Sequence, residues 1–139
     1  MNKIIARNRE HLKKLIEEEI KINGFDCNLN HIDISYIKDI SAIFQNLEFN
    51  GDISEWNVSK VENMERMFCD SKFNGDISKW DISNVKDMES MFYNSEIEEK
   101  PWWNIEDDEL REKLIKLKEL ENKLDNKLEE KEKTKKMKI

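Results

Sequence analysis

The stretch FNGDISEWNVSKVENMERMF, residues 49–68, is nearly repeated 24 residues later as FNGDISKWDISNVKDMESMF, residues 73–92. The same offset identifies an earlier, more divergent copy, FDCNLNHIDISYIKDISAIFQNLE, at residues 25–48. Three copies at 25–48, 49–72 and 73–96 share eight apolar columns without a gap, and a fixed period of this kind predicts a repeat architecture. The columns are Phe25/Phe49/Phe73, Leu29/Ile53/Ile77, Ile32/Trp56/Trp80, Ile34/Val58/Ile82, Ile37/Val61/Val85, Ile40/Met64/Met88, Ile43/Met67/Met91 and Phe44/Phe68/Phe92.

Each copy divides into two halves with different periodicity. Alternation of apolar residues toward the end of 53–58 predicts a short strand, and apolar residues spaced i, i+3, i+7 over 61–68 predict a short helix. Ser59 precedes that segment and Glu62 follows three residues later, which is the pattern of a capping box. The Asn-Gly pairs before Asp52 and Asp76 predict turns, because glycine accepts a positive φ at little cost.

One copy is too small to fold alone, since eight buried side chains cannot offset the conformational entropy of 24 ordered residues. We therefore predict an α/β solenoid, a short leucine-rich-repeat-like stack of parallel strands and short helices over 25–105, with a half-repeat at 97–105. Residues 1–24 are expected to form an N-terminal capping helix that ends at Asn23-Gly24. Residues 106–139 are expected to form a long C-terminal helix, acidic in its first turn, with a frayed tail from Glu130.

A resemblance supports this interpretation. Trp56-x-Val58 followed by Val61-x-x-Met64-x-x-Met67-Phe68 resembles the BspA-like leucine-rich repeats of bacterial surface proteins, over residues 25–96, with the first copy diverging. The resemblance implies a leucine-rich-repeat fold and, as in similar repeats, binding of other proteins, often as adhesins. Residues 1–20 contain no apolar run of the length that a signal peptide or membrane span needs, so we expect a small cytoplasmic binding unit with no membrane association.

No set of residues in the sequence indicates catalysis or a cofactor. Cys27 and Cys69 lack metal-ligand spacing with His11 and His31, so we expect reduced thiols, no metal site and no enzymatic activity. Two polar columns leave an alternative open, because they serve either as hydrogen-bond acceptors in turns or as a weak ladder of divalent-cation ligands. These columns are Asn28/Asp52/Asp76 and Asp33/Asn57/Asp81.

Charge is concentrated in the repeats. Residues 25–96 carry fourteen acidic and six basic side chains, a net charge of −8 in a chain of net −7. Direct contact with nucleic acid is not expected, because phosphate recognition needs clustered Lys and Arg.

The surface predicted to bind a partner protein is the polar face of the expected strands. Its residues are Asn30, His31, Asp33, Ser54, Glu55, Asn57, Ser78, Lys79 and Asp81, joined by Trp102 as an exposed aromatic anchor. The apolar row Leu117, Leu120, Leu124 and Leu128 is either part of a C-terminal cap or a homodimer interface.

Three functions are compatible with these features. A non-enzymatic protein-interaction module is the leading hypothesis. The alternatives are a small acidic phage-type inhibitor of a nucleic-acid-handling enzyme, acting by charge mimicry or occlusion, and a purely structural scaffold fragment derived from an adhesin repeat.

Overall fold

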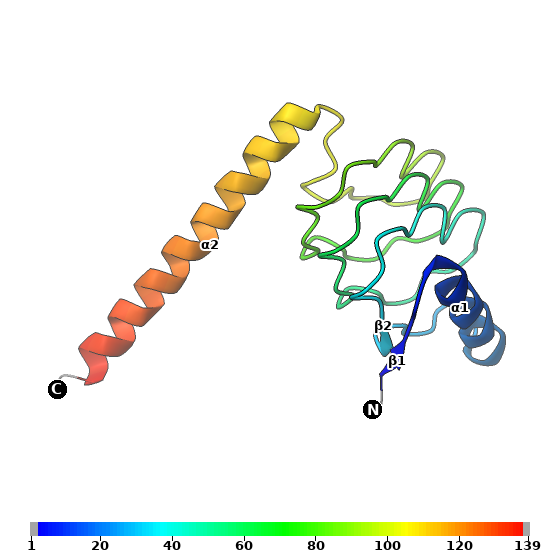
Figure 1. Cartoon of the computed structure of the whole chain (residues 1–139), viewed down its shortest axis with the longest axis horizontal. Coiled ribbons are helices and arrows are strands. Elements are labelled where there is room, and N and C mark those ends of the chain that lie inside the picture. The colour runs from blue at the N-terminus through cyan, green and yellow to red at the C-terminus, as the bar shows by residue number, and fades with distance from the viewer. Residues whose placement is uncertain (1–2, 138–139) are drawn as a thin grey trace. The chain divides into compact units, whose positions relative to one another are not determined.

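The computed structural model describes residues 3–137. The chain divides into two compact units, Met1–Pro101 and Trp102–Ile139. The first unit contains β1 (Ile4–Ile5), α1 (Arg9–Asn23) and β2 (Ile32–Asp33), and the second contains α2 (Asp108–Met137) (Figure 1). β1 and β2 pair in parallel, with Ile4 opposite Ile32 and Ile5 opposite Asp33. The ends of the predicted segments at residues 1–2 and 138–139 lie outside the described residues.

The fold-class prediction of an α/β solenoid is wrong. Within residues 3–137 there are two helices, both outside the repeats, and one sheet of two parallel strands. Only β2 lies in a repeat, so no strand-and-helix unit recurs, and residues 25–96 are built almost entirely of turns and isolated bridges. The predicted strands at 53–58 and helix at 61–68 are therefore corrected to turn structure.

Backbone hydrogen bonding explains why the second half of each copy is not helical. The amides of Met64, Arg66 and Phe68 donate to carbonyls of the following copy, as do those of the equivalent residues 40, 42 and 44, over 2.8–3.1 Å. The amides of Met67 and Cys69 instead close four-residue turns within the copy, for example Met67 N–H to the Met64 carbonyl at 3.2 Å. An α-helix needs each amide to reach the carbonyl four residues back, so this alternating pattern excludes it.

Left-handed residues recur at the same points of each copy. Ala42, Arg66 and Ser90 have φ of 54–56°, and the equivalent residues 46, 70 and 94 have φ of 51–60°. Each occupies the third position of a hydrogen-bonded turn, where a positive φ is the mark of a type II turn. Four residues apart, they interrupt any helix.

Side-chain acceptors hold the other turns. Every copy contains three Asn or Asp residues whose Oδ1 accepts the amide two residues later, at 2.8–3.1 Å, which is the geometry of an Asx turn. The predicted Ser59–Glu62 capping box does not form, since the Ser59 amide donates to Asn57 Oδ1 and no helix follows.

The predicted apolar columns are buried, with Phe25 (44% exposed) and the half-buried Met88 as exceptions. The rings of Phe44, Phe68 and Phe92 lie parallel at centroid distances of 5.7 and 5.5 Å, and Phe49 and Phe73 at 6.2 Å. Two indoles tie neighbouring copies together: Trp56 Nε1 donates to the Leu29 carbonyl at 2.9 Å, and Trp80 Nε1 to the Ile53 carbonyl at 3.2 Å. These columns form the core of the first unit.

Two glycines of the repeats serve close packing rather than positive φ, contrary to the sequence-based prediction. Positive φ among the glycines occurs only at Gly24. A Cβ on Gly51 would lie 1.8 Å from the Cys27 carbonyl oxygen, and one on Gly75 would lie 2.7 Å from the Phe73 ring. Gly51 is therefore required where adjacent copies approach closely, and Gly75 leaves room for the Phe73 ring of its own copy.

The N-terminal segment covers the first copy. Ile4 and Ala6 amides donate to the carbonyls of His31 and Asp33, both at 2.9 Å, and α1 buries Leu12 and Ile16. Asn8 caps the start of α1, which ends as expected at Asn23 with Gly24 at φ 85°. The predicted helix thus begins at Arg9, after a short strand.

In the second unit, α2 runs from Asp108 to Met137 without a break. Asp107 Oδ1 accepts the Leu110 amide at 3.0 Å at its start. The tail expected to fray from Glu130 is helical as far as Met137.

Candidate functional site

Six of the predicted binding residues lie at the tips of turns and not on strands. Ser54 and Glu55 are the two central residues of a turn closed by Trp56 N–H and the Ile53 carbonyl at 3.1 Å. The equivalent pairs, Asn30–His31 and Ser78–Lys79, occupy the same place in turns closed at 3.0 and 3.3 Å. We call residues 30–31, 54–55 and 78–79 the turn-tip row. The predicted strand face is corrected to this row, because the closing bonds fold the chain back at each pair.

The first pair of the row is already engaged within the chain. His31 Nε2 lies 3.0 Å from Glu19 Oε1 of α1, and its side chain is 17% exposed. Asn30 Oδ1 accepts the Glu55 amide at 2.9 Å. This end of the row therefore holds α1 and the second copy in place, which leaves the second and third pairs as the accessible part.

Three predicted residues serve as turn acceptors. Asp33, Asn57 and Asp81 each accept the amide of the serine two residues later, at 2.9–3.1 Å. Asn57 and Asp81 are exposed, whereas Asp33 is half-buried in β2. Their first task is structural, although the two exposed side chains border the accessible part of the row.

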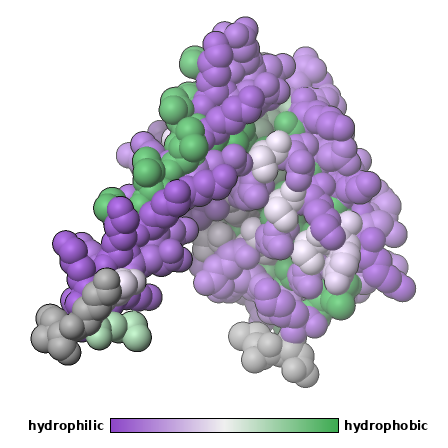
Figure 2. All heavy atoms as spheres, turned by 60° about the vertical axis from the view of Figure 1, so that its left-hand side comes forward, coloured by the Kyte–Doolittle hydropathy of each residue, from purple (hydrophilic) through white to green (hydrophobic). Residues whose placement is uncertain are grey.

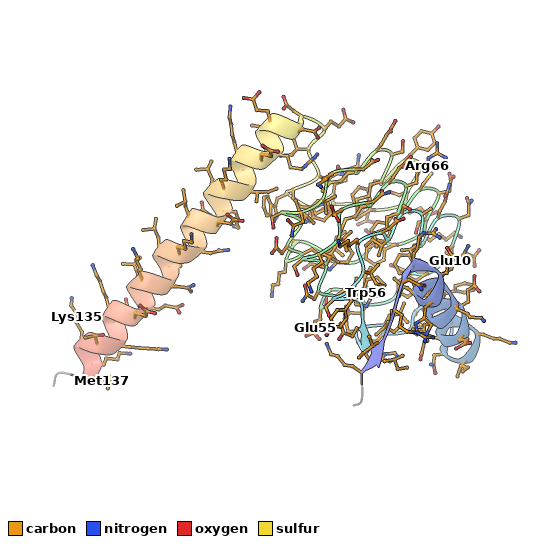
Figure 3. The ribbon with its side chains drawn as sticks, viewed as in Figure 1. Glu10, Glu55, Trp56, Arg66, Lys135 and Met137 are labelled. Atoms are coloured by element: carbon orange, nitrogen blue, oxygen red, sulfur yellow. The ribbon has the colours of Figure 1, made fainter. Side chains whose placement is uncertain are left out.

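A groove of about 590 Å³ opens beside the second and third pairs of the turn-tip row. Buried Ile53 and Phe73 line it together with polar side chains. The lining residues are Asp26, Asn50, Gly51, Asp52, Ile53, Ser54, Glu55, Phe73, Gly75, Asp76 and Lys79. Glu55 and Lys79 are exposed at its border, and Figure 3 shows Glu55 at the outer edge of the ribbon.

The groove is acidic and its carboxylates are held in fixed positions. Hydrogen bonds from the side chain and backbone amide of Ser54 lower the pKa of Asp52, and those of Ser78 lower the pKa of Asp76. Asp26 and Glu55 add further carboxylates, against the single ammonium group of Lys79. A negative surface with an apolar floor suits a partner that presents basic and apolar side chains.

Sequence reasoning found Ser54, Glu55 and Lys79 of this groove but missed the rest. Five of the eight missed residues come from the NGD stretches at 50–52 and 74–76, which we interpreted as turns, with their aspartates as turn acceptors or cation ligands. The sequence did contain a signal for the groove. Two copies of the NGD stretch, which has small polar side chains and a glycine, lie next to the turn-tip row and leave space for a hollow.

The structure assigns the acidic columns to turn formation. Asn28, Asp52 and Asp76 accept the amides of residues 30, 54 and 78, the hydrogen-bonding alternative considered above. Over residues 3–137, no three His, Cys, Asp or Glu side chains are grouped so as to hold a metal ion.

Neither thiol is activated. Burial, and then nearby acidic groups, raise the pKa of Cys27, and burial followed by the hydrogen bond to Asp70 raises that of Cys69. Both are free thiols and are protonated at neutral pH, which does not favour nucleophilic chemistry.

In the second unit, Trp102 is 39% exposed, and Lys118 Nζ lies 6.0 Å from the centre of its ring. Trp103 is buried, so the two adjacent indoles differ in exposure. The predicted oligomerisation residues Leu117, Leu120, Leu124 and Leu128 are 55–61% exposed. They lie on α2, in the second unit.

Within the described residues, neither helix combines the length and apolar character that crossing a bilayer requires. No match was found among curated proteins or among solved structures. A family model does match, over residues 11–126, which include most of α1, all three copies and the first part of α2. The chain therefore belongs to the family described as Mycoplasma protein of unknown function, DUF285.

Proposed function

We propose that this chain is a non-enzymatic protein-interaction module that binds a partner protein through the groove and the adjoining residues of the turn-tip row. One observation carries the proposal: the groove of about 590 Å³ combines an apolar floor, Ile53 and Phe73, with a border of exposed charges at Glu55 and Lys79. Interfaces commonly have this arrangement of an apolar centre and a polar rim. We also propose that residues 25–96 are related to BspA-like repeats. Similar repeats bind proteins, which supports the same function.

The groove is also pre-organised. The turn hydrogen bonds that fix Asp52 and Asp76 are formed before any partner binds, so little side-chain entropy is lost at these positions on association. Trp102, in the second unit, is a further candidate contact because of its exposure.

The test compares two variants of equal charge change. Glu55→Lys, Lys79→Glu and Asp81→Lys are combined in one chain, and Glu89→Lys, on the second half of the third copy, is the control. Both chains carry two more positive charges than the wild type, and all four positions are exposed. A partner captured from the native cell and identified by mass spectrometry is purified and titrated against each chain.

We expect the triple variant to bind at least about tenfold more weakly and the control to bind like the wild type. Circular dichroism and urea unfolding establish that both variants fold. Equal affinity of all three chains would exclude the groove border as the binding surface.

A second candidate is an inhibitor of a nucleic-acid-handling enzyme, and the acidic lining of the groove favours it. Such a partner would be basic, and its affinity would fall steeply with ionic strength because exposed charges are screened over about 8–10 Å at physiological salt. Binding that is insensitive to salt would argue against this candidate while leaving the first intact.

A further inference from the structure

α2 carries an apolar row that its own unit does not bury. Leu110, Leu117, Leu124 and Leu128 are 48–61% exposed, and the half-buried Leu114 lies between the first two. Figure 2 shows hydrophobic side chains, in green, aligned along α2. With Glu121 in the remaining place, the row follows intervals of four and three residues, the a and d positions of a coiled coil.

Charge disfavours a parallel pairing of this row with itself. In a parallel pair each residue meets its own equivalent at a and d positions, so Glu121 would face Glu121 inside the seam. A buried pair of like charges opposes association.

An antiparallel pairing removes the conflict in the seam. With the helices centred on residue 119, Leu110 packs against Leu128 of the second copy, and Leu114 against Leu124. Glu121 then meets Leu117 and lies about one residue along the axis from Lys118 of the second copy. Lys118 is already 3.5 Å from Glu121 in its own chain, so the carboxylate has a basic neighbour on either side.

Leu120 supplies an independent reason for this orientation. It is 55% exposed and falls outside the a and d positions, where a parallel pair would place it beside Asp125 of the other helix. In the antiparallel pair, residue 120 of one helix lies beside residue 120 of the other at the centre of the interface, so the two Leu120 side chains pack together. Lys113 and Lys127 do face each other, but they lie at the solvated rim, where the repulsion is screened.

We propose that α2 pairs with α2 of a second copy of this chain as an antiparallel coiled coil centred on residue 119. The dimer would present two copies of the first unit, and its interface is separate from the groove proposed to bind a partner. Failure of one proposal therefore leaves the other standing.

Sedimentation equilibrium of the full chain tests the association, with Leu124→Glu as the disrupting variant and Asn126→Glu as the control. Both substitutions add one negative charge to exposed positions of α2, but residue 126 lies on the opposite face. We expect wild type and control to reach twice the chain mass and Leu124→Glu to dimerise at least about a hundredfold more weakly. Unchanged helix content by circular dichroism verifies that the variant is folded. A wild type that stays monomeric, or a dimer that tolerates Leu124→Glu, overturns the proposal.

Disulfide trapping tests the orientation in a Cys27→Ser background, where the remaining thiol, Cys69, is buried. A mixture of Leu110→Cys and Leu128→Cys chains should form a disulfide between unlike chains on mild oxidation. Leu128→Cys alone should not, because in the antiparallel pair its two copies lie about 27 Å apart along the axis. Rapid self-crosslinking of Leu128→Cys would show a parallel pair and refute the orientation.

Discussion

Gly51 provides the most demanding test of how the copies pack. Alanine at this position would place its Cβ 1.8 Å from the Cys27 carbonyl oxygen and 2.6 Å from the Phe49 ring. The first contact is with backbone, which cannot move aside alone. Gly75, in the same NGD context of the third copy, would contact only the Phe73 ring within 3 Å, with the nearest backbone atom, the Gly51 carbonyl oxygen, at 3.6 Å.

The two sites therefore predict different losses of stability. Overpacking alone costs about 1–3 kcal/mol, which we expect for Gly75→Ala. At Gly51 the displaced backbone also disturbs the neighbouring Leu29 N–H to Asp52 carbonyl bond of 2.9 Å, which adds about 1 kcal/mol. We expect about 3–4 kcal/mol for Gly51→Ala, at the upper end of both terms.

Urea unfolding of the full chain at 25 °C, followed by tryptophan fluorescence, measures both values. Gly24→Ala serves as a further control, because nothing lies within 4 Å of its Cβ and only its φ of 85° opposes the substitution. Equal destabilisation by Gly51→Ala and Gly75→Ala would refute the argument, since it would mean that backbone contact between copies does not distinguish the two sites.

Three further predictions follow from the same packing. Phe68→Ala should reduce the free energy of unfolding by about 3–5 kcal/mol, because the ring is fully buried between two parallel phenylalanines; a loss below 1 kcal/mol in urea unfolding would contradict this. Trp56→Phe should lose about 0.5–1.5 kcal/mol in the same assay, because it removes the indole hydrogen bond to the Leu29 carbonyl, which still accepts the Ile32 amide. Asp52 has a pKa lowered by Ser54, so its contribution to stability is present above the unfolded-state pKa of about 3.9 and is lost as pH falls through the lower folded-state value. Asp52→Asn should therefore flatten the acid side of the stability–pH curve, and an unchanged curve would exclude this carboxylate as a contributor.

The sequence predicted which residues are buried in the core better than it predicted the conformation of the backbone that carries them. A fixed 24-residue offset requires equivalent residues to share an environment, so residues such as Leu29, Ile53 and Phe68 could be assigned to the core whatever the local conformation. The same columns could not distinguish a helix from consecutive turns, because both place every third or fourth side chain inward. The deciding features were the positive φ angles at Arg66 and Asp70. Arginine gives no sign of such a conformation, whereas Asn and Asp are enriched in it, so the column Asn46/Asp70/Asn94 carried a signal that the apolar pattern did not use.

The binding surface was predicted in part for a similar reason. Glu55 and Lys79 stand between buried columns, so their exposure follows from the pattern. His31 has the same place in its copy, but α1 supplies Glu19 as a partner, and contacts between distant segments leave no periodic signal. The groove itself depends on how closely Gly51 approaches Cys27, a distance that no residue pattern specifies.

The alternation of amides between neighbouring and internal carbonyls has an evolutionary consequence. Because residues 40–46 bond to residues 63–69 as residues 64–70 bond to residues 87–93, duplication or deletion of one whole 24-residue period would restore every bond across the junction. An insertion or deletion of one residue would instead exchange the amides that bond to the neighbouring copy with those that bond within their own copy, along the whole segment. Length variation among natural homologues should therefore occur in whole periods, with partial insertions confined to the flanking helices.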